Sequence, residues 1–143
     1  MPFNKLKNLL ICLLSLLPLL GLAQDTPTKN QLSTHILDIS TGQPAPGVTV
    51  RLHQYNAAQK TWTTLAEKKT DAAGRIPDFL PSASAAGTPG TYKLTFLTQL
   101  YFESKKQQSF YPFIEVVFEI KDGVHYHVPI TLSPYGYSTY RGS

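Results

Sequence analysis

The residues of this sequence best suited to chemistry are two histidines near its end. His125 and His127 are two positions apart, so both imidazoles lie on one face of an extended strand. A pair with that geometry can bind a metal ion, or it can supply a neutral imidazole for proton transfer near pH 7. It can also be a strand face that only meets water. The pair by itself is compatible with all three interpretations.

Three further features could contribute to a site. His35 lies in an apolar stretch, where a histidine is either a hydrogen-bonded packing residue or part of a site. Arg75 follows directly on a predicted turn at residues 71–74, and taken alone it is a surface arginine. The last four residues, Tyr140–Ser143, combine an aromatic ring, a guanidinium and a carboxylate, whereas the ends of domains are mostly unpatterned. His53 lies on the polar side of a predicted strand, and we interpret it as structural.

Several familiar kinds of site are absent from the sequence. It has no glycine-rich phosphate loop, no nucleophile-elbow serine and no HExxH zinc motif. Its single cysteine, Cys12, lies in a predicted leader segment. The remaining chain is therefore expected to have no disulfide, no thiolate nucleophile and no cysteine-bound metal.

Residues 1–23 are predicted to be a secretory signal peptide. Lys5 and Lys7 precede an apolar run at residues 9–20, and small residues at 21–23 follow at the usual cleavage spacing. The run is too short for a membrane-spanning helix with ordinary flanks, and an uncleaved anchor is the alternative. We therefore expect one domain over residues 24–143, located in the periplasm and no longer attached to a membrane.

The charge of that domain argues against a nucleic-acid partner. The 13 basic residues of the chain, less the two lysines of the leader, leave 11 against 9 acidic residues, a net charge of +2. A nucleic-acid interface would need a basic tract or stripe, and these basic residues form neither.

Most of the remaining chain shows the pattern of half-buried strands, in which apolar and polar residues alternate. Alternating or extended apolar segments are found at residues 32–39, 48–53, 61–67, 76–80, 91–96, 114–120 and 124–133. Seven or eight short strands separated by turns predict an all-β fold, an antiparallel β-sandwich with one core.

Three local expectations complete this outline. Trp62 is expected to be the large apolar anchor of its strand. Residues 98–107 are the one plausible helix, with Thr98 as a candidate N-cap. Asp122-Gly123 is a strong signal for a hairpin, so we expect it to turn the chain directly into the final strands.

Three sequence motifs together resemble the transthyretin-related family, and in particular its 5-hydroxyisourate hydrolases. They are LSTHILDISTGQPA at residues 32–45, TDAAGRI at 70–76 and HYHVPITLSPYGYSTYRGS at 125–143. The final YRGS is the most specific, because the hormone carrier transthyretin lacks it. The resemblance covers nearly all of residues 31–143, with mild departures at Ile130-Thr131 and Ala73.

The resemblance implies a fold, an assembly and a site. The fold is two four-stranded sheets with one short helix, and the assembly is a homotetramer, a dimer of dimers with sites in a channel between subunits. Transferred to this sequence, the catalytic residues are His35, Arg75, His127 and Ser143. Tyr140, Arg141 and Gly142 join His35 and Arg75 in binding the substrate, and His125 lies next to the site. The resemblance implies no cofactor and no metal.

The activity implied is the hydrolysis of 5-hydroxyisourate to 2-oxo-4-hydroxy-4-carboxy-5-ureidoimidazoline in urate degradation. We expect a neutral imidazole, from either His35 or His127, to activate water, and Arg75 to hold the carbonyl groups of the substrate. Three alternatives remain: a transthyretin-like carrier of a small ligand without catalysis, a zinc site at His35, His125 and His127, and a β-sandwich adaptor without chemistry.

Overall fold

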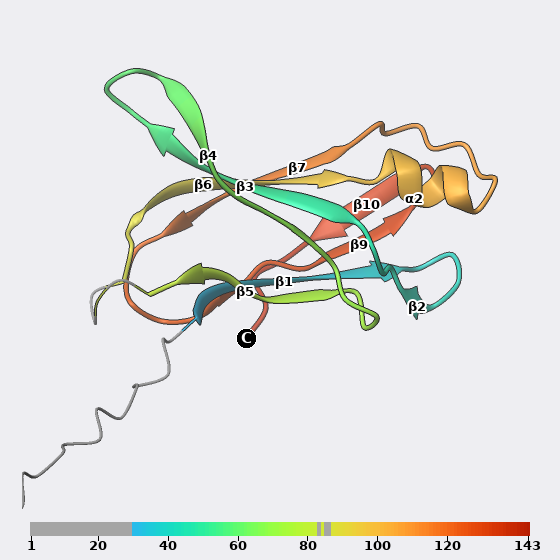
Figure 1. The fold of residues 1–143 in the computed structure, drawn as a ribbon, viewed down its shortest axis with the longest axis horizontal. Helices are drawn as coiled ribbons and strands as arrows, with labels where there is room; N and C mark the ends of the chain where they lie inside the picture. The colour runs from blue at the N-terminus through green and yellow to red at the C-terminus, as the bar shows by residue number, and fades with distance from the viewer. Residues whose placement is uncertain (1–29, 83, 85–86) are drawn as a thin grey trace, which may run out of the picture.

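The computed structural model describes residues 30–82, 84 and 87–143, and they form two facing β-sheets with one short helix at one end (Figure 1). The predicted signal peptide and its cleavage site lie outside the described residues. Within the part of the chain that is described, no helix is long and apolar enough to cross a membrane.

One sheet is regular and wholly antiparallel. Its strands run in the order β4–β3–β6–β7. Their bounds are Thr49–Asn56 for β3, Thr61–Lys69 for β4, Gly90–Leu97 for β6 and Ile114–Ile120 for β7. The alternation predicted for β3, β6 and β7 is confirmed, because Val50, Leu52, Leu94 and Phe96 are fully buried between the sheets. Apolar burial of this kind is the main source of stability in such a sandwich.

The other sheet is built around β1, and it holds both parallel and antiparallel pairs. β5 pairs antiparallel with β1, whereas β8 and β9 run parallel to it, and β10 returns antiparallel along β9. The bounds are Asn30–Asp38 for β1, Gln43–Pro44 for β2, Arg75–Pro81 for β5, Tyr126–His127 for β8, Ile130–Ser133 for β9 and Gly136–Thr139 for β10. The predicted sandwich of two sheets with a short helix is confirmed, but the sheet around β1 is not purely antiparallel.

The sequence predicted a hairpin at Asp122-Gly123, but this turn does not make one, and the parallel pairing follows from that. The turn carries the chain from β7 in one sheet to β8 in the other. The side-chain amide of Gln31 donates to the backbone carbonyl of Asp122 at 2.6 Å, and the Tyr126 hydroxyl accepts from the backbone amide of Lys121 at 3.0 Å. Burial of Tyr126 between the sheets therefore sets the crossing, and this tertiary contact overrides the local turn signal.

The predicted strand at residues 124–133 is divided in two. Pro129 has no N–H to donate to a ladder, so the pairing stops between β8 and β9. Val124 lies outside the strand and is exposed. Before this break the expected alternation holds: Tyr126 and Val128 are buried, and His127 is only half-buried.

Two other local expectations need correction. The helix α2 spans Gln99–Ser104 and not residues 98–107, because Lys106 takes a left-handed backbone conformation with φ of 56°. Thr98 is at the N-cap position but makes no side-chain capping bond. Trp62 is not a core anchor, since it is 37% exposed on β4, where the Lys93 ammonium lies over its ring.

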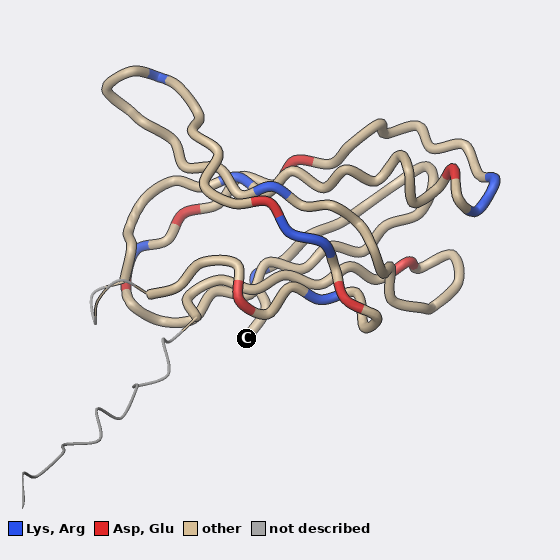
Figure 2. The backbone as a smooth tube through the Cα atoms, viewed as in Figure 1, with Lys and Arg blue, Asp and Glu red and all other residues tan. Residues whose placement is uncertain are grey.

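Charged residues are dispersed over the surface, as the sequence predicted. Figure 2 shows basic and acidic positions interspersed along the chain. Several of them form ion pairs, such as Arg51 with Glu67 at 2.6 Å on neighbouring strands of one sheet and Lys68 with Asp78 at 2.9 Å between the two sheets. Exposed pairs of this kind stabilise the fold only slightly.

Candidate active site

The pairing of β1 with β5 places His35 directly opposite Arg75. The two residues are partners in the antiparallel ladder, and side chains of paired residues lie on the same face of a sheet. On β1 the alternate residues Leu32, Thr34 and Ile36 point into the core. His35 and its partner Arg75 therefore project from the outer face of this sheet.

The turn before β5 holds Arg75 in that place. One oxygen of the Asp71 carboxylate accepts from the backbone amides of Ala73 at 2.9 Å and Arg75 at 2.8 Å. Gly74 has a φ of 70°, and a Cβ there would lie 2.7 Å from the carbonyl oxygen of Ile36. Glycine is thus required both by the backbone conformation and by the close approach of the turn to β1.

The pairing of β1 with β8 brings His127 to the same outer face. Ser33 and His127 are partners in the parallel ladder, and Ser33 is two residues from His35 on one strand. The Val128 amide donates to the Ser33 carbonyl at 3.0 Å, and the Thr34 hydroxyl donates to the Val128 carbonyl at 2.7 Å. These bonds fix β8 against the middle of β1.

A chain of hydrogen bonds connects both C-terminal histidines to β1. The Ser33 hydroxyl lies 2.8 Å from Nδ1 of His127 and 2.8 Å from Nε2 of His125. The other ring nitrogen of His125, Nδ1, lies 2.8 Å from the backbone carbonyl of Asn30. Within the described residues, the hydrogen bonds to the His127 ring are made at Nδ1 and none at Nε2.

The surroundings keep both site histidines neutral near pH 7. Burial and the Arg75 guanidinium lower the pKa of His127, and the nearby His125 and His35 lower it further. The pKa of His35 is lowered by burial and by Arg75, against an opposing effect of the Ala73 backbone and the Asp71 carboxylate. A neutral imidazole has a lone pair that can take a proton from water.

The end of the sequence reaches the same histidine. The Gly142 amide donates to the His127 carbonyl at 2.9 Å, in an isolated antiparallel bridge. A Cβ at position 142 would lie 2.5 Å from Cδ2 of the His127 ring, so the backbone of Gly142 packs directly on the imidazole. Ser143 follows and is exposed. The structure thus brings four predicted site residues together: His35, Arg75, His127 and Gly142.

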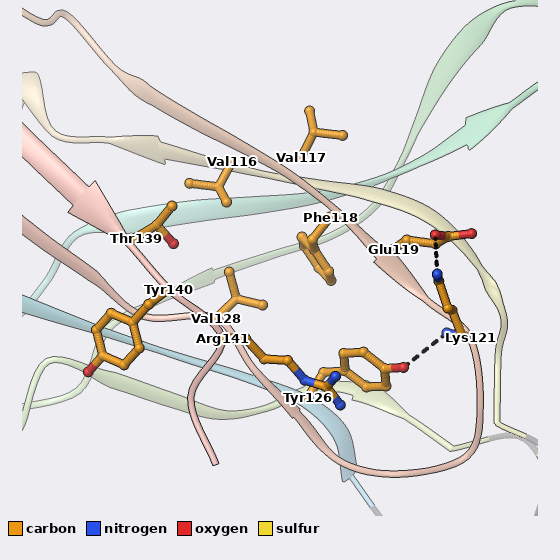
Figure 3. Close-up of a pocket in the computed structure, with 10 residues that line it drawn as sticks. All are labelled: Val116, Val117, Phe118, Glu119, Lys121, Tyr126, Val128, Thr139, Tyr140 and Arg141. Carbon is orange, nitrogen blue, oxygen red and sulfur yellow. Dashed lines mark hydrogen bonds and ion pairs between the residues drawn. The ribbon is translucent and has the colours of Figure 1, made fainter.

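Arg141 and Tyr140 lie differently. The guanidinium of Arg141 stacks over the ring of Tyr126 with its central carbon 4.9 Å from the ring centre. Arg141 lines a groove of about 360 Å³ that is bordered by β7 and the C-terminal segment. In Figure 3 the Tyr140 ring points away from Arg141. Tyr126 and Val128 line this groove, and His127 lies between them in sequence. By strand alternation, the groove and the histidine cluster are on opposite sides of β8.

Sequence reasoning missed Ser33. Its signal was present, because Ser33 precedes His35 by two residues on one strand and so shares its face. Its role became visible only through pairing with a segment 94 residues away. His125, which the sequence left beside the site, is joined to it through this serine.

The arrangement suits acid–base chemistry better than metal binding. Across residues 30–82, 84 and 87–143, no three His, Cys, Asp or Glu side chains are grouped closely enough to hold a metal ion. The cluster offers neutral imidazoles as proton acceptors and a guanidinium that can bind carbonyl oxygens or an anion.

Comparisons with known proteins agree with the sequence resemblance and with the two-sheet fold. A 5-hydroxyisourate hydrolase of Salmonella dublin is 53% identical over 116 residues, which cover 80% of this chain and 82% of that protein. The solved structure of 5-hydroxyisourate hydrolase from Klebsiella pneumoniae aligns with a TM-score of 0.66 at 45% identity, over 78% of this chain and 98% of that one. Transthyretin from Sparus aurata aligns with a TM-score of 0.73 at 30% identity, over 80% of this chain and 97% of that one.

Likeness in fold does not separate an enzyme from a carrier, but all three similar proteins point to one family. The match to that family covers residues 32–142, a range that includes nearly every described residue. From its sequence, its two-sheet fold and the relatives it matches, this chain belongs to the HIUase/Transthyretin family.

Proposed function

We propose that this chain is a hydrolase that converts 5-hydroxyisourate to 2-oxo-4-hydroxy-4-carboxy-5-ureidoimidazoline in urate degradation. The observation that carries the proposal is the cluster on the outer face of the β1 sheet. There His35 and His127, each with a lowered pKa, lie beside the Arg75 guanidinium. The extensive identity to enzymes named 5-hydroxyisourate hydrolase supports the choice of substrate.

The chemistry required is the opening of a cyclic acyl–nitrogen bond by water. The imidazole takes one proton from water as the water oxygen bonds to the acyl carbon. The carbon–nitrogen bond then breaks, and the ring nitrogen leaves with a proton. The products are a carboxyl group and an N–H, so one water molecule is consumed and no electrons are transferred. His35 and His127 both hold the water, and one of the two takes its proton.

Arg75 supplies the positive charge that this reaction needs. Its planar fork can bind two substrate oxygens at once, and it stabilises the negative charge that develops on the attacked carbonyl. Gly142 shapes the site through its contact with the His127 ring. We place Ser143 and Tyr140 at the rim, where they orient and enclose the substrate, whereas the Arg141 guanidinium lies over Tyr126 on the other side of β8.

We further propose that copies of this chain assemble as a tetramer that encloses the site. In the single chain His35 and His127 are only half-buried, and Arg75 is exposed. A site that deprotonates water works better when bulk water is excluded, and a neighbouring subunit would cover the open face. Light scattering on the purified protein would test this, and a monomer at working concentration would contradict it.

The location of the protein is also a proposal. Residues 1–23 have the sequence of a signal peptide, so the domain that begins at Gln24 is placed in the periplasm. Mass spectrometry of the protein from a periplasmic extract should give the mass of a chain that starts at Gln24. A full-length chain that stays with the cytosol would contradict the location without affecting the proposed reaction.

The activity is tested with freshly made 5-hydroxyisourate, whose decay is followed by absorbance and compared with spontaneous hydrolysis. Catalytic decay at low protein concentration is expected, whereas a carrier would bind the compound without accelerating its decay. Arg75→Lys should lower kcat/KM about a hundredfold, because lysine lacks the planar fork. Arg51→Lys is the matched control, since Arg51 pairs with Glu67 in the other sheet, and it should keep full activity.

A further inference from the structure

The geometry points to Ser33 and His125 as positioning residues that hold His127 in the tautomer with hydrogen on Nδ1, so that Nε2 carries the lone pair that takes the proton from water. The inference rests on the proposed function for its catalytic meaning. It assigns the base between the two histidines, and it assigns a task to the serine and the second histidine.

The argument starts at the backbone carbonyl of Asn30. A carbonyl oxygen can only accept a hydrogen bond. Nδ1 of His125, which lies 2.8 Å from it, must therefore carry a hydrogen. When His125 is neutral, its second nitrogen, Nε2, then has no hydrogen and offers a lone pair.

The second step passes through Ser33. Its hydroxyl lies 2.8 Å from Nε2 of His125, and it has a single hydrogen to donate. That hydrogen goes to the lone pair of His125, so toward His127 the same oxygen can only accept. Nδ1 of His127, at 2.8 Å, must in turn carry a hydrogen. The lone pair of neutral His127 is left on Nε2.

The opposite direction of bonding is disfavoured by charge. It would need hydrogen on both ring nitrogens of His125, and the positive charge of that ring would lie beside His127, on which His125 and Arg75 disfavour positive charge. Only in that state could Ser33 donate to Nδ1 of His127 and leave hydrogen on Nε2, where it would block the base. With His125 neutral, every bond in the chain points toward Asn30.

The same contacts fix the orientation of the ring. Nδ1 is bonded to Ser33 on one edge, and the backbone of Gly142 packs on Cδ2 at the other. When Nε2 takes a proton, the positive charge spreads to Nδ1–H and strengthens its bond to Ser33. Because each bond polarises the next, the chain to Asn30 stabilises the charged ring cooperatively.

The direct test is the tautomer of His127, read from the nitrogen chemical shifts of ¹⁵N-labelled protein by NMR at pH 8. The wild type is expected to show hydrogen on Nδ1 and a bare Nε2. Ser33→Ala removes the acceptor, so a large share of Nε2–H should appear. In parallel, kcat should fall about tenfold or more while KM changes little, the usual result when an orienting partner of an imidazole is lost.

A pair of substitutions at His125 separates the hydrogen bond from mere bulk. His125→Gln keeps an oxygen that can accept from Ser33, and it should retain kcat within about twofold and preserve the Nδ1–H tautomer. His125→Leu has no acceptor, so both the tautomer and kcat should shift in the direction of Ser33→Ala. His125 is exposed, so neither change should prevent folding. His53→Leu removes a histidine from the other sheet and is the matched control.

Hydrogen on Nε2 of His127 in the wild type at pH 8 would overturn the inference. An unchanged tautomer in both Ser33→Ala and His125→Leu would do so too. If the wild type did not hydrolyse 5-hydroxyisourate, the proposed function would fail, yet the NMR spectra would still decide the tautomer. The two failures are therefore distinguishable.

Discussion

His53 on the outer face of the regular sheet and His127 on the outer face of the β1 sheet both have a lowered pKa, but their rings are bonded differently. On the regular sheet, burial and Lys93 lower the pKa of His53. Both of its ring nitrogens are occupied, Nδ1 by Thr64 at 3.0 Å and Nε2 by Thr95 at 3.1 Å. In His127 the described residues occupy only Nδ1. A lowered pKa thus does not by itself distinguish His127 from His53; the ring nitrogen that no described residue engages, beside the Arg75 guanidinium, does.

The two sheets also differ in the regularity of their strand pairing. The ladder from β4 to β7 has one register shift, between Leu52 and His53. The pairing of β1 with β5 has two within a shorter ladder, and β1 also accepts parallel partners. This irregular sheet is the one that gathers side chains from distant parts of the sequence. The following predictions test the contrast between the two faces, beginning with the largest effect.

His127→Ala should cause the greatest loss, about a hundredfold or more in kcat, because it removes the proton acceptor. The folded state should survive, since His127 is only half-buried. Steady-state kinetics with 5-hydroxyisourate, together with a thermal melt, measure both effects. Nearly full activity in this variant would remove His127 from the mechanism.

Gly142→Ala should lower kcat about tenfold through His127 alone. The added Cβ would lie 2.5 Å from Cδ2 of the ring and 3.2 Å from its Cβ, so the imidazole must turn away and strain its bond to Ser33. Gly136→Ala is the control, because a Cβ there meets only the Ser133 hydroxyl at 3.8 Å. Equal kinetics in the two variants would show that the contact at position 142 is unimportant.

The pH dependence should show an acid limb below the ordinary histidine pKa of about 6.5. Folding lowers the pKa of both His35 and His127, so the neutral form persists to lower pH, and more than half of kcat/KM should remain at about pH 6.5. The folded state also binds fewer protons than the unfolded one. Stability from these groups is therefore present above about 6.5 and is lost as the pH falls through the folded-state pKa. A limb centred above 6.5 in a pH–rate profile would contradict this.

His53→Leu should have the smallest effect on activity, within about twofold of the wild type. It removes two hydrogen bonds to threonines, so a loss of about 1 kcal/mol in the free energy of unfolding is expected. Urea denaturation and the kinetic assay measure the two quantities separately. A large loss of activity here would remove the distinction between the two faces.

The regular sheet was largely predictable from the sequence, because alternation over β3, β6 and β7 reflects burial of one face and needs no knowledge of partners. The same holds for the turn before Arg75, whose aspartate and glycine act within a few residues. The β1 sheet was less predictable. The Asp122-Gly123 signal is local, and the contact of Tyr126 that overrides it is not.

The sequence indicated which residues would lie in the cluster, but it did not indicate the hydrogen bonds that connect them. Resemblance to known motifs indicated His35, Arg75, His127 and Gly142, and the structure brings them together. Nothing local indicated that Ser33 would bond two histidines more than ninety residues away. Hydrogen bonds between distant strands depend on register, and single-sequence patterns do not carry register between strands that are not neighbours in the chain.

The dependence of the cluster on β1 has a consequence for folding. Ser33 and its partner His127 are 94 residues apart in the sequence. Contacts of such high sequence separation form late and slowly in folding. The ladder between β3 and β4, which are neighbours in the chain, can therefore form early, whereas the cluster is complete only after the segment with His127 and Gly142 has docked on β1.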